Sequence, residues 1–367
     1  MSFSILGLGT AVPPHAMSQA EAVDLARQVI CETDEQARLL AALYRLAGVA
    51  NRYSVLPHRI ALEWLPNADA TATGEVDTAV EKSLGPTTGE RMQFFVEHAA
   101  ALAQQAAQRA LDDSGIDRRQ ISHLVTVCCT GFASPGVDVD LMCNLGLRPT
   151  TQRIHVGFMG CHGSINGLRV AHAITTADPA ARVLLCAVEL CSLHYRFQWD
   201  PERIVANALF ADGAAAIVAG GEATPAGGWG VAATGSCLLP DSQDAMTWRI
   251  GDHGFEMTLS NRVPDLINAH LRPWLTEWLG NHGHTLESIG SWAIHPGGPR
   301  VLTAVEEALA LPKGSTAVSR EVLRDFGNMS SATVLFILER FRRANAPHPC
   351  VALAFGPGLM AEAALFE

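Results

Sequence analysis

The sequence predicts an α/β protein built from two similar halves, and three observations support that prediction. Short apolar runs that end in Gly, Pro or Ser alternate with longer stretches whose apolar residues recur at helical spacing. A Gly- and Ala-rich break at Ala219–Gly230 interrupts this pattern, and the alternation resumes after it. The length of 367 residues suffices for one large domain or two fused ones.

The strands expected in the first half are short apolar runs followed by turn-forming residues: Ser4–Leu8, Leu124–Cys129 and Val183–Val188. Met92–Ala110 places its apolar residues three and four positions apart, which predicts an amphipathic helix, and Gly115 is expected to end it. Asn67–Gly89 is rich in Thr, Ala, Asp and Gly, and we expect an exposed loop or lid there. Gly7 and Gly9 do not form a dinucleotide loop, because Val12 stands where the third glycine would be.

The same order of elements is expected beyond the break. Trp248–Leu259 predicts a hairpin that turns at Gly251-Asp252. The other expected strands and helices are Gly230–Ser236, Ser291–Ile294, Val301–Leu309 (helix), Ser330–Arg343 (helix) and Val351–Phe355. We therefore divide the chain into residues 1–222 and 223–367.

Composition excludes several classes of protein. The chain has 26 Lys and Arg against 37 Asp and Glu, a net charge of −11, which argues against a nucleic-acid partner. It does not exclude a locally basic entrance to a site for an anionic ligand. Apolar runs fall far short of the roughly 18 residues of a membrane span, and the first residues lack the basic region of a secretory signal. The nine cysteines are spread through apolar stretches rather than spaced as a disulfide framework. We expect a reduced, cytoplasmic protein.

Cys161 stands in a turn of small residues, Gly160-Cys161-His162-Gly163-Ser164, that leads into an apolar helix. At a helix amino terminus the dipole favours the thiolate, and an ordinary thiol of pKa about 8.5 is only ~3% ionised at pH 7. The sequence thus presents Cys161 as a candidate nucleophile, with a small buried cysteine as the alternative.

Two further turns carry polar residues. His295 ends an expected strand and precedes Pro296-Gly297-Gly298-Pro299, so it is either a site residue at a loop mouth or a hydrogen-bonded core histidine. Asn328, in Gly327–Ala332, is either a site residue or the cap of the next helix. Together with Cys161 they are the parts of a nucleophilic site for thioesters, which the fold must assemble because they are far apart in the chain.

These segments, in this order, resemble the type III polyketide synthases, the chalcone synthase-like family of the thiolase fold, and its bacterial type. The resemblance covers almost the whole chain and rests on five stretches: Gly160-Cys161, His295–Pro299, Gly327–Ala332, Phe355–Gly358 and Ala208–Ala215. It implies two similar αβαβα halves that form a five-layered core, a homodimer, and coenzyme A thioesters as substrates with no further cofactor.

The resemblance also implies roles for individual residues. Cys161 would carry the starter acyl group, while His295 and Asn328 would hold the malonyl thioester carbonyl as CO₂ leaves; two donors aimed at that oxygen stabilise the charge that develops there. Phe210 would stand between the coenzyme A tunnel and the reaction chamber. The other implied substrate-binding residues are Cys129, Ser134, Cys191, His194, Met257, Gly356 and Pro357; the first five differ in type from the Thr, Met and Phe common in plant enzymes.

The remaining candidates are basic or metal-ligand types. Arg52, Arg59 and Arg300 are candidates for binding the phosphates of coenzyme A, with solvated surface as the alternative for each. Cys191 and His194 lie three residues apart, but there is no second pair at ligand spacing, so no metal site is expected.

The resemblance therefore implies an acyltransferase that extends a starter acyl-CoA with malonyl-CoA units by decarboxylative Claisen condensation and then cyclises the product. The alternative is a ketoacyl-ACP synthase III-like enzyme that performs one condensation with malonyl delivered by a carrier protein. A hydroxymethylglutaryl-CoA synthase would require a carboxylate base that these motifs do not provide. A silent acyl-CoA-binding scaffold would not require all three of Cys161, His295 and Asn328.

Overall fold

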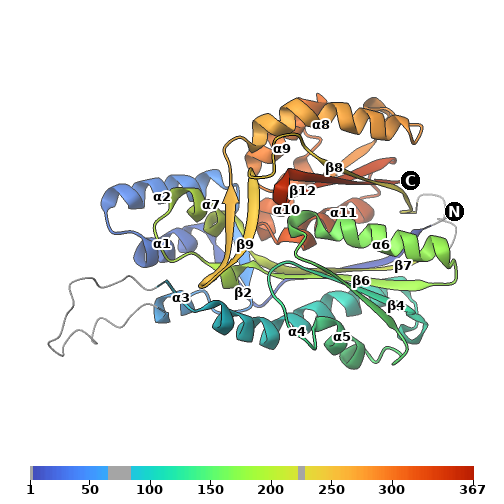
Figure 1. Ribbon diagram of the computed structural model, residues 1–367, viewed down its shortest axis with the longest axis horizontal. Coiled ribbons are helices and arrows are strands. Elements are labelled where there is room, and N and C mark those ends of the chain that lie inside the picture. The colour runs from blue at the N-terminus through green and yellow to red at the C-terminus, as the bar shows by residue number, and fades with distance from the viewer. Residues whose placement is uncertain (1–2, 65–83, 222–227) are drawn as a thin grey trace.

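The computed structural model describes residues 3–64, 84–221 and 228–367. Its core has five layers in the order helix, sheet, helix, sheet, helix (Figure 1). One sheet has the strand order β1-β7-β6-β4-β5 and the other β11-β12-β13-β8. The predicted α/β, thiolase-like architecture is therefore confirmed. The strands of the two sheets are β1 (Ser4–Ala11), β4 (His123–Cys128), β5 (Gln152–Gly157), β6 (Arg182–Leu190), β7 (Asp212–Gly220), β8 (Val231–Leu238), β11 (Ser291–Ile294), β12 (Cys350–Gly356) and β13 (Met360–Phe366).

The two sheets repeat one pattern of pairing. In the first, β1 runs antiparallel to β7, β7 antiparallel to β6, and β6 parallel to β4. In the second, β8 runs antiparallel to β13, β13 antiparallel to β12, and β12 parallel to β11. The chain therefore folds the same unit twice, and β5 is an extra edge strand of the first sheet.

Helices cover both outer faces and fill the space between the sheets (Figure 1). Helices α4 and α5 lie under the first sheet, α8 and α9 lie over the second, and α6 and α11 lie in the middle layer. The bounds of the helices of the layers are α4 (Thr88–Ser114), α5 (Val137–Leu145), α6 (Gly163–Ala177), α8 (Val263–Gly280), α9 (Pro299–Leu309), α10 (Ala317–Phe326) and α11 (Thr333–Arg343).

Helix α4 shows how local signals set an element. Thr87 and Glu90 form a reciprocal capping box at its start, and Gly115, with φ 65°, ends it in the left-handed conformation. The helix is longer than the predicted Met92–Ala110 at both ends. A Cβ on Gly7 or Gly9 of β1 would lie 2.2 or 2.5 Å from carbonyl oxygens of α4, so these glycines allow the strand to pack directly on the helix.

A smaller group of elements extends from one side of the layers (Figure 1). It comprises α1 (Gln19–Ile30), α2 (Asp34–Leu46), α3 (Ile60–Glu63), α7 (Pro201–Leu209) and the paired strands β2 (His15–Ser18) and β3 (Asn51–Ser54). The hairpin β9 (Met246–Gly251) and β10 (Gly254–Leu259) turns at Asp252-His253, one residue later than expected. Residues 67–83 of the expected loop, and 222–227 of the expected break, lie outside the described residues.

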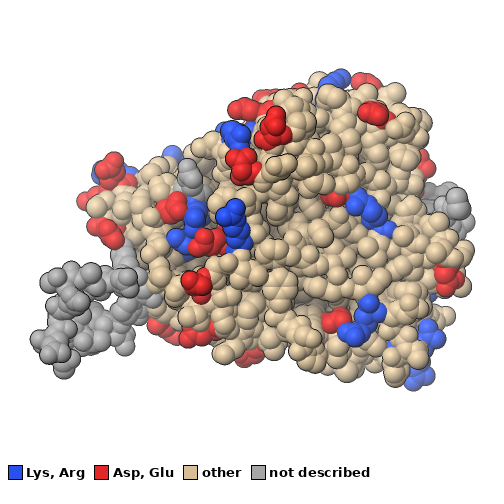
Figure 2. All heavy atoms as spheres, in the orientation of Figure 1, with Lys and Arg blue, Asp and Glu red and all other residues tan. Residues whose placement is uncertain are grey.

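Among the described residues, no helix is both long and apolar enough to cross a membrane. Acidic and basic side chains are interspersed on the face shown in Figure 2. The predicted helix Ser330–Arg343 starts as a 3₁₀ turn, Ser330–Ala332, and becomes α11 at Thr333.

Candidate active site

Cys161 lies in a 3₁₀ turn (Gly160–His162) that runs directly into α6. Gly160 has a φ of 73°, a left-handed conformation that glycine adopts without strain. A Cβ at this position would lie 2.4 Å from Cδ of Pro357, so glycine lets the turn approach the opposite loop. Cys161 is thereby held at the amino end of α6, where it lines a cavity.

A matching turn precedes α11. Gly327 ends α10 with a φ of 74°, and the 3₁₀ turn Ser330–Ala332 leads into α11 as the first turn leads into α6. Oδ1 of Asn328 accepts a hydrogen bond from the amide of Ser330 at 2.9 Å, so Asn328 caps this turn. Ser330 Oγ lies 3.7 Å from the Cys161 sulfur, and the Asn328 side chain acts to lower the pKa of that thiol. The amino ends of the two middle-layer helices therefore meet at one thiol.

His295 directly follows β11 and is 1% exposed. Its backbone continues the ladder, because its amide donates to the carbonyl of Leu353 at 2.8 Å. Neither ring nitrogen has a hydrogen-bond partner among the residues that the structure describes. A buried polar group without a partner costs about 1–3 kcal/mol, so the imidazole is poised for a ligand rather than satisfied as a core histidine.

Burial dominates the electrostatics of this group. It raises the pKa of the Cys161 thiol to about 12, although hydrogen bonds from Ser330 and Asn328 oppose the shift. Burial also lowers the pKa of His295 to about 3, with a smaller contribution from His162. Both shifts favour the neutral forms of the two groups, the thiol and the imidazole. The sequence predicts a thiolate favoured by the helix dipole, and the loss of hydration in the cavity acts in the opposite direction.

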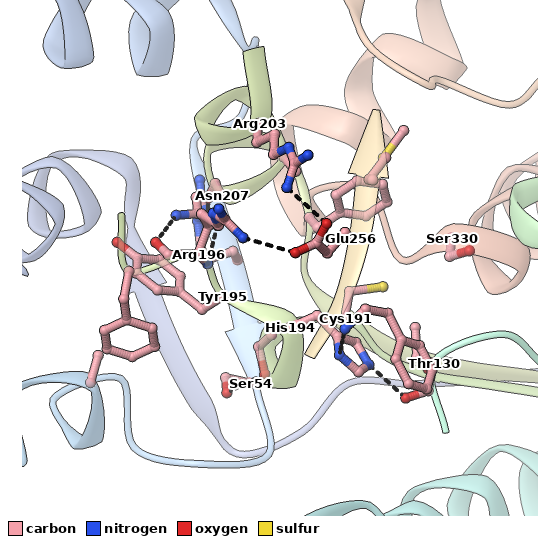
Figure 3. Close-up of a pocket in the computed structure, with 18 of the residues that line it drawn as sticks. Ser54, Thr130, Cys191, His194, Tyr195, Arg196, Arg203, Asn207, Glu256 and Ser330 are labelled. Carbon is pink, nitrogen blue, oxygen red and sulfur yellow. Dashed lines mark hydrogen bonds and ion pairs between the residues drawn. The ribbon is translucent and has the colours of Figure 1, made fainter. Parts of the chain in front are cut away.

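The cavity beside Cys161 has about 1550 Å³ of empty space, part of it open to solvent. Phe210, which follows α7, lines it together with further residues of the predicted set: Cys129, Cys191, His194, Met257, Pro357 and Arg52. Figure 3 shows Cys191, His194 and Ser330 on one side of this space and Tyr195, Arg196 and Asn207 on the other. Ser134 is exposed, whereas Gly356, His295 and Asn328 are buried; none of these four residues is among those that line the cavity.

An aromatic wall, formed by His194, Trp248 and Phe255, closes one side of the cavity. Nε2 of His194 donates to the carbonyl of Thr130 at 2.7 Å, and its Nδ1 accepts from the amide of Phe255 at 2.9 Å. Nε1 of Trp248 donates to the carbonyl of Cys129 at 2.8 Å. Burial lowers the pKa of His194 to about 3, which keeps the ring in the neutral form that this bonding requires. The β9–β10 hairpin is thus fastened to the turn after β4.

The predicted phosphate-binding arginines have different environments. Arg52 is buried, and its guanidinium donates to the carbonyls of Asn207 and Ala208 and to Gln19, so its charge is engaged inside the protein rather than at a mouth. Because Arg52 also lines the cavity, its role in binding coenzyme A stays a prediction. Arg59 and Arg300 are exposed at the starts of α3 and α9.

Sequence reasoning missed a buried carboxylate beside the site. Glu189 on β6 is fully buried, and its carboxylate accepts hydrogen bonds from the Thr130 hydroxyl at 2.7 Å, the Cys129 amide at 3.0 Å and the Ser331 hydroxyl. Burial raises its pKa. A charged residue inside the apolar run Arg182–Leu190 was the available signal. Among the described residues, no cluster of three or more His, Cys, Asp or Glu side chains could hold a metal ion.

Comparisons with known proteins agree with this geometry. Residues 2–223 match the family model for the N-terminal domain of chalcone and stilbene synthases, and residues 231–367 match the model for their C-terminal domain. The chain belongs to the chalcone and stilbene synthase family. It is a type III polyketide synthase, an acyltransferase-type condensing enzyme.

Relatives of this synthase come from several kingdoms. It is 36% identical, over 99% of its chain and 93% of the relative, to a 1,3,6,8-tetrahydroxynaphthalene synthase of Streptomyces peucetius subsp. caesius. It is 33% identical, over 99% and 90%, to an alpha-pyrone synthesis polyketide synthase-like protein of Mycobacterium tuberculosis. The crystal structure of PKS-I from the brown alga Ectocarpus siliculosus superposes with a TM-score of 0.90 at 29% identity, covering 100% of this chain and 98% of that one.

Proposed function

We propose that this synthase condenses malonyl-CoA iteratively with a starter acyl group held on Cys161 and then cyclises the chain. The observation that carries this proposal is the meeting of the two helix-start turns at Cys161. His295 adds a buried imidazole that has no hydrogen-bond partner among the described residues. A nucleophile, two donors for an oxyanion and a cavity for the substrate are the parts that this chemistry requires.

In the loading step the Cys161 sulfur attacks the carbonyl of the starter thioester, and coenzyme A leaves as its thiol. His295, which is neutral, accepts the thiol proton as the bond forms and passes it to the sulfur of the departing coenzyme A, which restores the neutral imidazole. Since burial raises the pKa of Cys161, we propose that the thiolate arises only when the substrate occupies the cavity.

In the extension step His295 and Asn328 hold the thioester oxygen of malonyl-CoA while its carboxylate departs as CO₂. The resulting enolate carbon attacks the acyl carbonyl on Cys161, and the sulfur leaves. A neutral imidazole suits this step because it can donate a hydrogen bond to the developing oxyanion. The cavity lined by Phe210, Cys129, Cys191, His194 and Met257 would then shape the growing chain, and no cofactor beyond the coenzyme A thioesters takes part.

We also propose a homodimer with its interface at the edge strand β5. Ile154 on β5, Phe132 and Met159 each expose about two fifths of their surface, and Phe132 packs against Phe158, beside Met159, with ring centroids 5.5 Å apart. Exposed large apolar residues at an edge strand are typical of an interface. Ser134 follows Phe132 and lies outside its own cavity, which suits a residue that serves the neighbouring subunit.

Three smaller proposals follow from the same site. Exposed Arg59 and Arg300 bind the coenzyme A phosphates. The division into residues 1–222 and 223–367 is supported by the two family models, which end at residue 223 and begin at residue 231. All nine cysteines are free thiols, which supports a reducing, cytoplasmic location.

The test is mass spectrometry of the products that the purified enzyme makes from malonyl-CoA with short, long and aromatic acyl-CoA starters. We expect polyketide masses that correspond to two or more extensions with at least one starter class. A single condensation, or activity only with malonyl on a carrier protein, would contradict the proposal and favour a ketoacyl-ACP synthase III-like enzyme.

A further inference from the structure

His162, which directly follows the nucleophile, has no part in the reaction described above. It is 4% exposed, and its Nδ1 lies 2.7 Å from Oδ1 of Asn166, one turn further along α6. Nδ2 of Asn166 donates to Oε1 of Glu362 at 3.1 Å. Because the Asn166 amide donates to Glu362, its oxygen faces His162, and Nδ1 of the imidazole must carry the proton that it donates.

The chain of polar groups continues into the second sheet. Glu362 on β13 is 3% exposed and also accepts from the Ser236 hydroxyl on β8 at 2.8 Å. Arg169 of α6 forms an ion pair with Glu362 and donates to the carbonyl of Gly235 on β8 at 3.2 Å. We call His162, Asn166, Glu362 and Arg169 the polar chain. It fastens helix α6, which directly follows the turn of Cys161, to two strands of the other sheet.

The opposite edge of His162 fills a space beside the substrate cavity. A Cβ on Gly356 would lie 2.3 Å from Cδ2 of His162 and 2.5 Å from its Nε2. Gly356 precedes Pro357, which lines the cavity and packs against Gly160. The imidazole is thus held between the turn of the nucleophile and the loop after β12, and the polar chain fixes its orientation.

This position matters because the reacting groups come from different parts of the fold. Cys161 belongs to the turn after β5 of the first sheet, whereas His295 follows β11 of the second sheet and Asn328 precedes α11. The enolate held by His295 and Asn328 must meet the acyl carbon on Cys161 at near-attack distance. A misplacement of about 1 Å can cost about 10²-fold in rate.

We propose that His162 is a positioning residue that, through Asn166 and Glu362, sets the distance between the acyl group on Cys161 and the enolate held by His295 and Asn328. This inference rests on the proposed function. In this inference the polar chain takes no part in acyl loading of Cys161 or in decarboxylation of malonyl-CoA. It determines how efficiently the enolate then attacks the acyl group.

The test separates three readouts in the full-length enzyme. Intact-protein mass measures acyl loading of Cys161 from acyl-CoA alone, CO₂ release measures decarboxylation of malonyl-CoA alone, and the ratio of polyketide carbon–carbon bonds to CO₂ measures coupling. For His162→Leu we expect coupling to fall by about 10²-fold while loading and decarboxylation each stay within about threefold of the wild-type rates.

Matched variants keep the test decisive. His162→Asn places an amide donor near Nδ1 and should restore coupling, whereas His162→Gln places it near Nε2 and should not. The comparison of His162→Asn with His162→Gln still tests the inference if His162→Leu does not fold. Asp113→Asn is the control, since Asp113 of α4 makes a different contact between layers, with Arg342 of α11, away from the site. It should leave coupling unchanged.

Three outcomes would overturn the inference: wild-type coupling in both His162→Leu and His162→Gln, an equal fall of all three readouts, or equal coupling in His162→Asn and His162→Gln. The proposed function fails separately, if the wild-type enzyme itself forms no carbon–carbon bond with any starter.

Discussion

At Cys161, burial and the proposed chemistry act on the thiol in opposite directions. Burial raises its pKa to about 12, whereas the reaction requires the thiolate. Well below the pKa of a thiol, the thiolate fraction rises about tenfold per pH unit. We therefore expect the alkylation rate of Cys161 by iodoacetamide, in the absence of substrate, to rise about tenfold per unit between pH 7 and 9. Peptide mass spectrometry measures the rate, with Cys161→Ser as the blank. A rate that is already level from pH 6 upward would instead indicate a resting thiolate–imidazolium pair.

His295 and Asn328 are expected to matter for decarboxylation even without a starter. Replacing either by Ala removes one donor to the developing oxyanion, and loss of one such donor costs about 10²–10³ in rate. CO₂ release from malonyl-CoA alone measures this, with Cys161→Ala as a variant that keeps both donors. Wild-type rates in Asn328→Ala and His295→Ala would assign these residues to another step.

The low pKa of His295 also predicts the pH dependence of that decarboxylation. Burial lowers the pKa to about 3, so the ring stays neutral as pH falls from 7 to 5 and protonates only near pH 3. In the wild-type enzyme, CO₂ release should therefore show no acid limb centred near pH 6.5, the ordinary value for histidine. Measuring initial rates from pH 5 to 8 tests this, and a tenfold loss by pH 5.5 would contradict it.

At the scale of elements, the sequence predicts the strands and helices that depend only on the order of neighbouring residues. Ser291–Ile294 was predicted without error, and β1, β4, β6 and β12 within a few residues, because short apolar runs bounded by turn residues need no tertiary information. Helix α2 was not assigned; it buries only Leu40 and Tyr44, so its apolar stripe is thin. The three turns with Cys161, His295 and Asn328 were visible as motifs, but Glu189 and the polar chain depend on contacts between distant strands.

The β9–β10 hairpin should limit how far a polyketide grows. Trp248 closes one side of the cavity and is anchored by its bond to the Cys129 carbonyl. We expect Trp248→Ala to open the wall and to shift the product masses upward by at least one malonyl-derived unit. Trp248→Phe keeps an aromatic ring but loses the hydrogen bond, so it should keep the product length and lose about 1 kcal/mol of stability. Product mass spectrometry and thermal unfolding separate the two effects; unchanged masses in Trp248→Ala would place the length limit elsewhere.

At the scale of the whole molecule, the duplicated unit explains why one site arises from two distant motifs. In each unit a 3₁₀ turn leads into the middle-layer helix, α6 in one and α11 in the other. The two sheets also share one pattern of strand pairing. Stacking the two units back to back brings these turns together, one with the nucleophile and the other with the amide donor. His295 directly follows β11 of the second sheet, and the cavity is lined by residues of both the smaller group of elements and the layers.

The edge of the first sheet should then join two such molecules. Strand β5 has a sheet neighbour on one side only, β4, and Ile154 and Met159 are exposed near its end. Ile154→Glu combined with Met159→Glu places two charges in the proposed interface, where burying an unpaired charge is costly. We expect the double variant to elute as a monomer in size-exclusion chromatography with light scattering, while the wild type elutes at twice the chain mass. Leu46→Glu, at a residue 70% exposed on α2, is the matched control and should leave the dimer intact. A wild-type monomer, or an intact dimer in the double variant, would rule out this interface.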